Sequence, residues 1–163
     1  MKTLMFLRHA KSSWAEPGIS DHDRPLTERG KQDAPRVGQW LKEQGLTPDL
    51  IVCSTAKRAV KTANKVARTC GYQGVIEETD TLYLAPADQY LEYVRQLPDQ
   101  HNLVLVVGHN PGLEDAVEAL TGHCERLATA TLAQVSLEIA CWRELPSSPT
   151  GRLVNLCHPK QLP

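Results

Sequence analysis

This chain lacks the features that mark several large functional classes. Its 163 residues carry a formal net charge of −1 and a pI near 6.6, so no overall basic field favours nucleic-acid binding. Only a few apolar residues separate the first Met from Arg8, too few for a signal-peptide core or a membrane span. We therefore expect a cytoplasmic protein that has neither a nucleic acid nor a membrane as partner, and any anion-binding site must be local.

The cysteines do not indicate a cross-linked or metal-bound framework. There are five, an odd number, and no two of them form a C-x-x-C pair. This argues against disulfides and against a zinc knuckle, and predicts buried thiols instead. The length fits a single domain of residues 1–163, and the sequence shows no internal repeat and no domain linker.

Apolar runs alternate with helical patterns along the chain, and this alternation predicts the fold. Strands are predicted at residues 4–7, 49–53, 75–76, 103–107, 132–139 and 152–157, and helices after Thr27, after Ser54-Thr55, from about Pro86, and from Asn110-Pro111 to Gly122. Pro35 should kink or restart the first helix. Residues 132–139 alternate apolar and polar, which predicts a strand near an edge with one wetter face. The fold class is α/β, a three-layer α/β/α sandwich with a mostly parallel central sheet and one antiparallel strand.

Two histidines follow the ends of predicted strands. His9 comes after the first apolar run, and His109 comes after the strongest one, at residues 103–107. In an open α/β sheet the carboxyl ends of the strands border the ligand crevice, so the two imidazoles can share one site. A single histidine in such a place is more often a hydrogen-bonded loop residue. The matched placement of the two indicates function.

Two arginines can reach the same edge of the sheet. Arg8 ends the first strand, and Arg58 lies in the first turn of a helix, where side chains tilt back toward the helix N-terminus. Arginine forks match the oxygens of a phosphoryl group, and nearby cations keep an imidazole neutral. The residues therefore predict a phosphoryl-binding pocket in which either histidine can be the nucleophile.

Four motifs, in order along residues 4–113, resemble those of the histidine phosphatase superfamily, and most closely its SixA-type phosphohistidine phosphatases. They are Leu7-Arg8-His9-Ala10-Lys11-Ser12, Asp23-Arg24-Pro25-Leu26-Thr27-Glu28-Arg29-Gly30, Ser54-Thr55-Ala56-Lys57-Arg58-Ala59 with Thr62-Ala63, and Val107-Gly108-His109-Asn110-Pro111-Gly112. The resemblance implies that His9 is the nucleophile that becomes phosphorylated. It also implies that Arg8 and Arg58 bind the phosphoryl oxygens, that His109 stabilises the transferring group, and that neither a metal nor another cofactor takes part.

Ala10 and the chain length point to one branch of that superfamily. The larger mutases usually have Arg-His-Gly where this chain has Arg8-His9-Ala10, and they carry lid-forming insertions for which this chain has little room. An open site admits a phosphoryl group mounted on a protein. The resemblance thus implies a phosphatase acting on phosphohistidine in a protein, such as a histidine-phosphorylated phosphotransfer protein.

The sequence leaves four candidates for the proton donor of the site. Glu78 and Asp80 fall where larger relatives place an acidic residue, whereas Asp21 and Asp23 lie in the first loop, as in similar small members. Any of the four can be a solvated loop carboxylate. We favour Asp23, which can equally pair with Arg29 or cap a turn. A missing acid matters less for phosphohistidine, because imidazole, with a pKa of about 6.5, leaves phosphorus with modest proton assistance.

Three alternatives follow from the same residues. The first is a phosphatase for small phosphomonoesters, and the second is a noncatalytic module that binds phosphate. The third is a hydrolytic metal site formed by His9, His109 and a loop carboxylate, which the two arginines oppose because they repel a cation. Residues 123–163 carry no functional signal.

Overall fold

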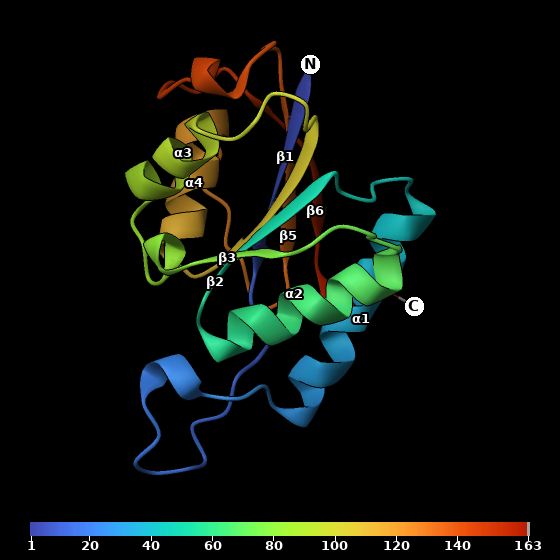
Figure 1. Ribbon diagram of the computed structural model, residues 1–163, viewed down its shortest axis with the longest axis vertical. Helices are drawn as coiled ribbons and strands as arrows, with labels where there is room; N and C mark the ends of the chain where they lie inside the picture. Colours follow the sequence, from blue (N-terminus) through green and yellow to red (C-terminus); the bar gives the residue numbers. More distant parts are fainter. Residues whose placement is uncertain (163) are drawn as a thin grey trace.

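The computed structural model describes residues 1–162, which form one six-stranded sheet with helices on both faces (Figure 1). The strands are β1 (Lys2–Arg8), β2 (Leu50–Ser54), β3 (Glu77–Thr79), β4 (Leu103–Gly108), β5 (Leu132–Leu137) and β6 (Arg152–Cys157). The helices are α1 (Glu28–Glu43), α2 (Lys57–Cys70), α3 (Ala87–Arg95) and α4 (Gly112–Thr121). Short 3-10 turns lie at Asp21–Asp23, Asp80–Leu82, Trp142–Glu144 and Pro159–Gln161.

The strand order places the chemistry-bearing strands at the centre. It is β3-β2-β4-β1-β5-β6, in which β5 alone runs opposite to its neighbours. The predicted mostly parallel sheet with one antiparallel strand is thus confirmed. In the parallel pairing of β1 with β4, Arg8 lies opposite Gly108. The residues that come next, His9 and His109, therefore leave the sheet side by side.

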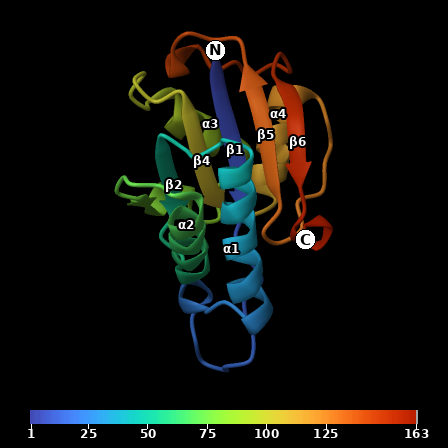
Figure 2. The same ribbon diagram turned by 90° about the vertical axis from the view of Figure 1, so that its right-hand side faces the viewer.

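The helices form the two outer layers. Figure 2 shows α1 and α2 over one face of the sheet and α3 and α4 over the other. Residues 104–107 in β4 are completely buried, as expected for a continuous apolar run in a parallel sheet covered on both faces. None of the helices in residues 1–162 is both long and apolar enough to cross a membrane.

Helix α1 begins as predicted but does not restart. The side chain of Thr27 accepts a hydrogen bond from the backbone N–H of Gly30, at 3.1 Å, and so caps the first turn. The helix then continues through Pro35 as one element to Glu43. Of the two outcomes expected at Pro35, a kink or a restart, the restart does not occur, and residues on both sides of the proline pack against α2.

Three other expectations need correction. The third strand lies at Glu77–Thr79 and not at residues 75–76, and Val75 is exposed. Helix α4 begins at Gly112, with Pro111 as its N-cap, one residue later than predicted. The predicted wetter face of β5 is mostly covered, since Gln134 is buried and accepts a hydrogen bond from Asn155, at 2.7 Å, while Ser136 is half-buried; the predicted place near an edge is confirmed, because only β6 lies beyond β5. The predicted pairing of residues 152–157 beside this strand is confirmed.

The cysteines match the prediction in part. Cys53, Cys70 and Cys157 are buried, whereas Cys124 is exposed and Cys141 is half-buried. None of the five forms a disulfide in the described part of the chain.

Candidate active site

The ends of β1 and β4 bring the two histidines together beneath the sheet. Their ring centroids are 5.3 Å apart, and the rings are tilted by 54°. Both side chains are almost fully enclosed, with 7% of His9 and 2% of His109 exposed. The two imidazoles therefore meet at the carboxyl ends of the strands, as expected.

The hydrogen bonds of His9 determine which of its nitrogens carries the proton. Its Nδ1 lies 2.8 Å from the carbonyl oxygen of Ala10, which can only accept, so Nδ1 donates. Its Nε2 lies 3.4 Å from Nε of Arg58, which can only donate. Nε2 therefore carries the lone pair, and it faces the arginine. This is the orientation that a nucleophilic imidazole needs.

His109 takes the opposite tautomer. Its Nδ1 accepts from Nη2 of Arg58 at 3.4 Å, so its Nε2 carries the proton and donates to the hydroxyl of Ser54, at 2.8 Å. The backbone N–H of His109 donates to the hydroxyl of Tyr90, at 3.0 Å. Side chain and backbone are both held, so the ring has one orientation.

Both imidazoles are neutral at neutral pH. The pKa of His9 is lowered to about 4, chiefly by burial and also by the positive charges of Arg58 and Arg8, against the hydrogen bond to Ala10, which raises it. Burial, with His9 and Arg58, lowers the pKa of His109 to about 3. Neutral His9 keeps its lone pair available for attack on phosphorus.

The two arginines lie differently in the site. Arg58 is buried and lies between the two rings. Arg8 extends toward the last third of the chain, where its Nη1 donates to the carbonyl oxygen of Leu127 at 3.2 Å. Its Nε is buried without a hydrogen-bond partner among residues 1–162, and the side chain lines a hollow together with Asn110 and Arg126. Arg8 thus has donor capacity left for an anion.

Of the four candidate acids, Asp21 lies against the site. Its carboxylate accepts hydrogen bonds from Arg58 (3.0 Å), Tyr83 (2.5 Å) and Arg24 (2.9 Å), and its backbone carbonyl accepts a fourth, from Arg58, at 2.6 Å. Partial burial raises the pKa of this carboxyl, but the hydrogen bonds from Tyr83, Arg58 and Arg24 outweigh it and hold the pKa well below its usual range. Asp21 is therefore ionised at neutral pH.

The other three carboxylates lie outside this cluster. The side chain of Asp23 is 72% exposed and accepts a hydrogen bond from Ser20. It does not pair with Arg29, whose partner is Asp33. Glu78 is exposed, and the carboxylate of Asp80 accepts a hydrogen bond from the hydroxyl of Thr55. The structure thus places Asp23, the favoured acid, away from the histidines, because the turn at Asp21–Asp23 points its first carboxylate inward and its last outward.

The comparisons with known proteins agree with this arrangement. Residues 4–82 match the family model of the histidine phosphatase superfamily (branch 1). A solved structure from Nakamurella multipartitia, assigned as a SixA phosphohistidine phosphatase, is 30% identical with a TM-score of 0.86, over 97% of this chain and 96% of that one. The chain belongs to the histidine phosphatase superfamily, in its SixA-type branch.

Two further relatives extend the comparison. An uncharacterised chloroplastic protein of Arabidopsis thaliana is 32% identical over 152 residues, which are 88% of this chain and 70% of that protein. A protein histidine phosphatase SixA complexed with tungstate shares the fold at 23% identity, with a TM-score of 0.82 over 97% of both chains. The predicted resemblance to this family is confirmed, and the protein is a phosphatase that works through a histidine.

Two residues at the site were not predicted to have a role, although Ser54 opens the third motif. Tyr83 binds Asp21, and its ring packs edge-on against those of His109 and His22. Ser54 ends β2 at the same edge of the sheet as the histidines, and that shared position is the signal that could have identified it. Tyr83 follows no strong strand, and nothing in its local sequence marks it.

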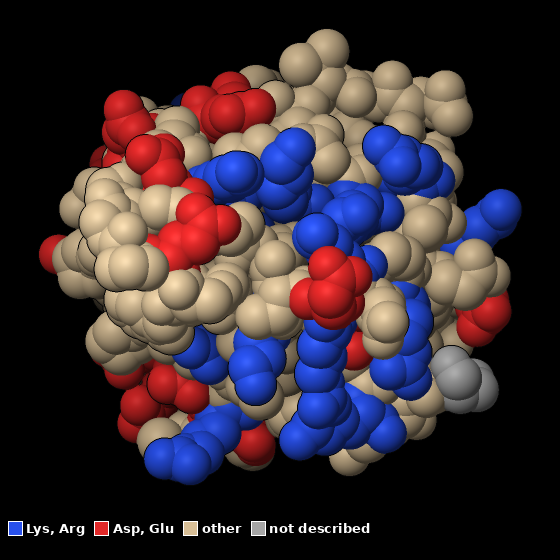
Figure 3. All heavy atoms as spheres, turned by 90° about the horizontal axis from the view of Figure 1, so that it is seen from below, with Lys and Arg blue, Asp and Glu red and all other residues tan. Residues whose placement is uncertain are grey.

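The face around the site is positively charged. Figure 3 looks onto the lower end of the molecule in Figure 1, where the loop before α1 and the starts of α1 and α2 lie, and Lys and Arg side chains gather across its middle. Four of the lysines border one hollow between these helices: Lys31, Lys57, Lys61 and Lys65. Such a field attracts anionic substrates. Residues 1–162 contain no group of three or more His, Cys, Asp and Glu side chains arranged to hold a metal ion.

Proposed function

We propose that the protein removes the phosphoryl group from phosphohistidine in a protein, with His9 as the nucleophile and without a metal ion. The observation that carries the proposal is the orientation of His9. Its Nδ1–H is bound to Ala10, and its Nε2 lone pair faces Arg58, an anion-binding side chain. A neutral imidazole held in this way is prepared for in-line attack on phosphorus.

The proposed reaction has two steps. Nε2 of His9 attacks phosphorus, the P–N bond to the substrate imidazole breaks, and the bonding electrons stay on that imidazole, which takes a proton from water. Water then attacks phospho-His9, and His9 leaves with the electron pair as inorganic phosphate forms. Arg58 and Arg8 hold the phosphoryl oxygens, and His109, whose ring Ser54 holds in place, stabilises the transferring group.

The state of Asp21 favours phosphohistidine as the substrate. This carboxylate is ionised, and its three donors hold it in that form, so it has no proton to give to a leaving group. An alkoxide needs such a proton, whereas imidazole leaves with little help. The positive face around the site also suits a substrate carried on an acidic protein surface (Figure 3).

The test uses a synthetic peptide that bears one phosphohistidine. We expect the wild-type protein to release phosphate from it in the presence of EDTA, and a quenched reaction to contain acid-labile phosphate on His9. The His9→Ala variant should lose at least 10³-fold in kcat/KM, as expected for loss of a nucleophile. His123→Ala removes an exposed histidine and serves as the matched control. Full turnover by His9→Ala would contradict the proposal.

A substrate panel separates the proposal from its alternatives. The peptide is compared with sugar and nucleotide monophosphates under the same conditions. Higher kcat/KM on a monophosphate would favour a small-molecule phosphatase. Binding of tungstate without phosphate release from any substrate would favour a noncatalytic module.

A further inference from the structure

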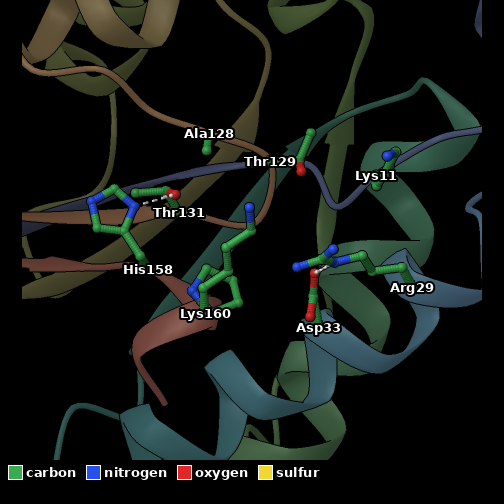
Figure 4. Close-up of a pocket in the computed structure, with 9 residues that line it drawn as sticks. Lys11, Arg29, Asp33, Ala128, Thr129, Thr131, His158 and Lys160 are labelled. Atoms are coloured by element: carbon green, nitrogen blue, oxygen red, sulfur yellow. Dashed lines mark hydrogen bonds and ion pairs between the residues drawn. The ribbon is translucent and has the colours of Figure 1, made fainter.

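Another hollow lies beside the segment that carries His9, and the proposed reaction does not use it. It has a volume of about 170 Å³ (Figure 4). Its walls come from the loop after β1, from α1, from the segment before β5 and from the C-terminal turn, and its lining residues are Lys11, Arg29, Asp33, Ala128, Thr129, Thr131, His158, Pro159 and Lys160.

Two of these walls are attached to the nucleophile's own segment. The backbone N–H of Ala130 lies 3.1 Å from the carbonyl oxygens of both Arg8 and His9. On the other side, α1 packs directly against the chain just after His9: a Cβ atom on Gly30 would lie 2.3 Å from the carbonyl oxygen of Lys11. The hollow therefore has a fixed position beside the segment that carries His9.

The lining of the hollow has an excess of positive charge. Three cationic side chains line the hollow, those of Lys11, Arg29 and Lys160. The lining has a single carboxylate, that of Asp33, which pairs with Arg29 and also with Arg36, at 3.5 Å. In Figure 4 the end of the Lys160 side chain and the guanidinium of Arg29 point into the space between them. The ammonium groups of Lys11 and Lys160 make no hydrogen bond or ion pair with any other residue in the part of the chain that the structure describes.

Its polar groups and size suit a small oxyanion. Thr129 lines the hollow with a hydroxyl that has no hydrogen-bond partner among residues 1–162, whereas Thr131 is bound to Nδ1 of His158 at 3.0 Å. A water molecule takes about 30 Å³ in the liquid, so the hollow has room for a carboxylate or phosphate group. Three cations from separate segments repel one another, and an anion between them removes that repulsion.

We propose that this hollow binds a second anionic group of the substrate, a carboxylate or phosphate on the same molecule whose phosphoryl group His9 accepts. The inference rests on the proposed function and adds to it a rule of selectivity. Substrates that carry an anion at the right distance from the phosphoryl group bind more tightly than otherwise identical neutral ones.

The test compares two phosphohistidine peptides that differ only in flanking Glu or Gln residues. We expect the wild-type protein to have about a tenfold lower KM for the Glu peptide, a difference of about 1.4 kcal/mol. In the double variant Lys11→Gln/Lys160→Gln that preference should disappear, with kcat on the Gln peptide unchanged. Lys42→Gln, which removes an exposed lysine from the far end of α1, should keep the preference.

A second pair of substrates identifies the source of the anion. A sugar bisphosphate is compared with the corresponding monophosphate in the same three proteins. If the wild-type protein prefers the Glu peptide and the double variant does not, the anion is a protein carboxylate. If the wild-type protein prefers the bisphosphate and the double variant does not, the anion is a small-molecule phosphate. If the double variant changes KM equally for both members of each pair, or for neither, the subsite is disproved. Failure of the wild-type protein on the Gln peptide would instead contradict the proposed function.

Discussion

The guanidinium of Arg58 has several hydrogen-bond acceptors, and some of these bonds must break when a phosphoryl group binds to it. Its guanidinium donates to His9, to His109 and to Asp21. Of these acceptors only Asp21 is an anion, so it holds the position that a phosphoryl oxygen needs. At the scale of single residues, the carboxylate of Asp21 therefore competes with substrate for Arg58.

Replacing Asp21 should strengthen anion binding. In Asp21→Asn the amide keeps the shape of the side chain but removes the negative charge that repels a dianion. We expect inorganic phosphate or tungstate to bind about tenfold more tightly, because a charged hydrogen bond contributes about 1.5–3 kcal/mol. Isothermal titration calorimetry measures the change.

Asp23→Asn is the matched control for that measurement. Its side chain is 72% exposed and lies in the same turn, so its Kd for phosphate should equal that of the wild-type protein. Weaker binding in Asp21→Asn would show that the carboxylate positions Arg58 for the phosphoryl group and does not compete with it.

At the scale of elements, the position of Arg58 depends on how closely α2 packs against α1. Gly38 makes the close approach possible, since a Cβ atom there would lie 2.6 Å from the carbonyl oxygen of Val66. The hydroxyl of Thr69 donates to the carbonyl oxygen of Pro35 across the same contact, at 3.0 Å. The helix whose first turn carries Arg58 is thus held by contacts further along its length.

Enlarging Gly38 should loosen this contact. We expect Gly38→Ala to lower the free energy of unfolding by about 1–3 kcal/mol, because the backbone of α2 cannot yield without moving the helix. Urea unfolding measures the loss. Gln39→Ala changes the next residue, which is exposed, and should alter the free energy by less than about 0.5 kcal/mol. Equal midpoints for the two variants would contradict this account of the packing.

At the scale of the whole molecule, the enclosed histidines connect the site to global stability. Because β1 lies inside the sheet and pairs with both β4 and β5, we propose that residues 1–163 form one domain that unfolds as a unit. Unfolding then exposes His9 and His109 together. Their folded pKa values of about 4 and about 3 lie below the unfolded value of about 6.5, so the unfolded chain binds protons that the folded protein does not.

The protein should therefore lose stability in mild acid. The free energy of unfolding is undiminished above about pH 6.5 and falls as the pH drops toward 4, by on the order of 2 kcal/mol for each histidine at pH 4.5. Urea titrations at pH 7.5 and 4.5 measure the difference. The double variant His9→Asn/His109→Asn should show a smaller drop between these two pH values, whatever its stability at pH 7.5. An equal drop in both proteins would contradict neutral burial of the histidines.

The sequence by itself determined the α/β class, most of the strands and helices, the four motifs and the placement of His9 and His109 at one edge of the sheet. These follow from local periodicity and from the rule that parallel strands end at a common edge, so residues far apart in the chain can be placed together before any contact is known. It also predicted that Arg58 points back to that edge.

Only the tertiary structure decided which carboxylate faces the histidines. Asp21 and Asp23 have the same chemistry and lie two residues apart, and the direction of Asp21 depends on Arg58 and Tyr83, which come from other segments. The covered face of β5 and the cationic hollow beside His9 likewise depend on residues near the C-terminus. Such features arise from contacts between distant parts of the chain, and no local pattern encodes them.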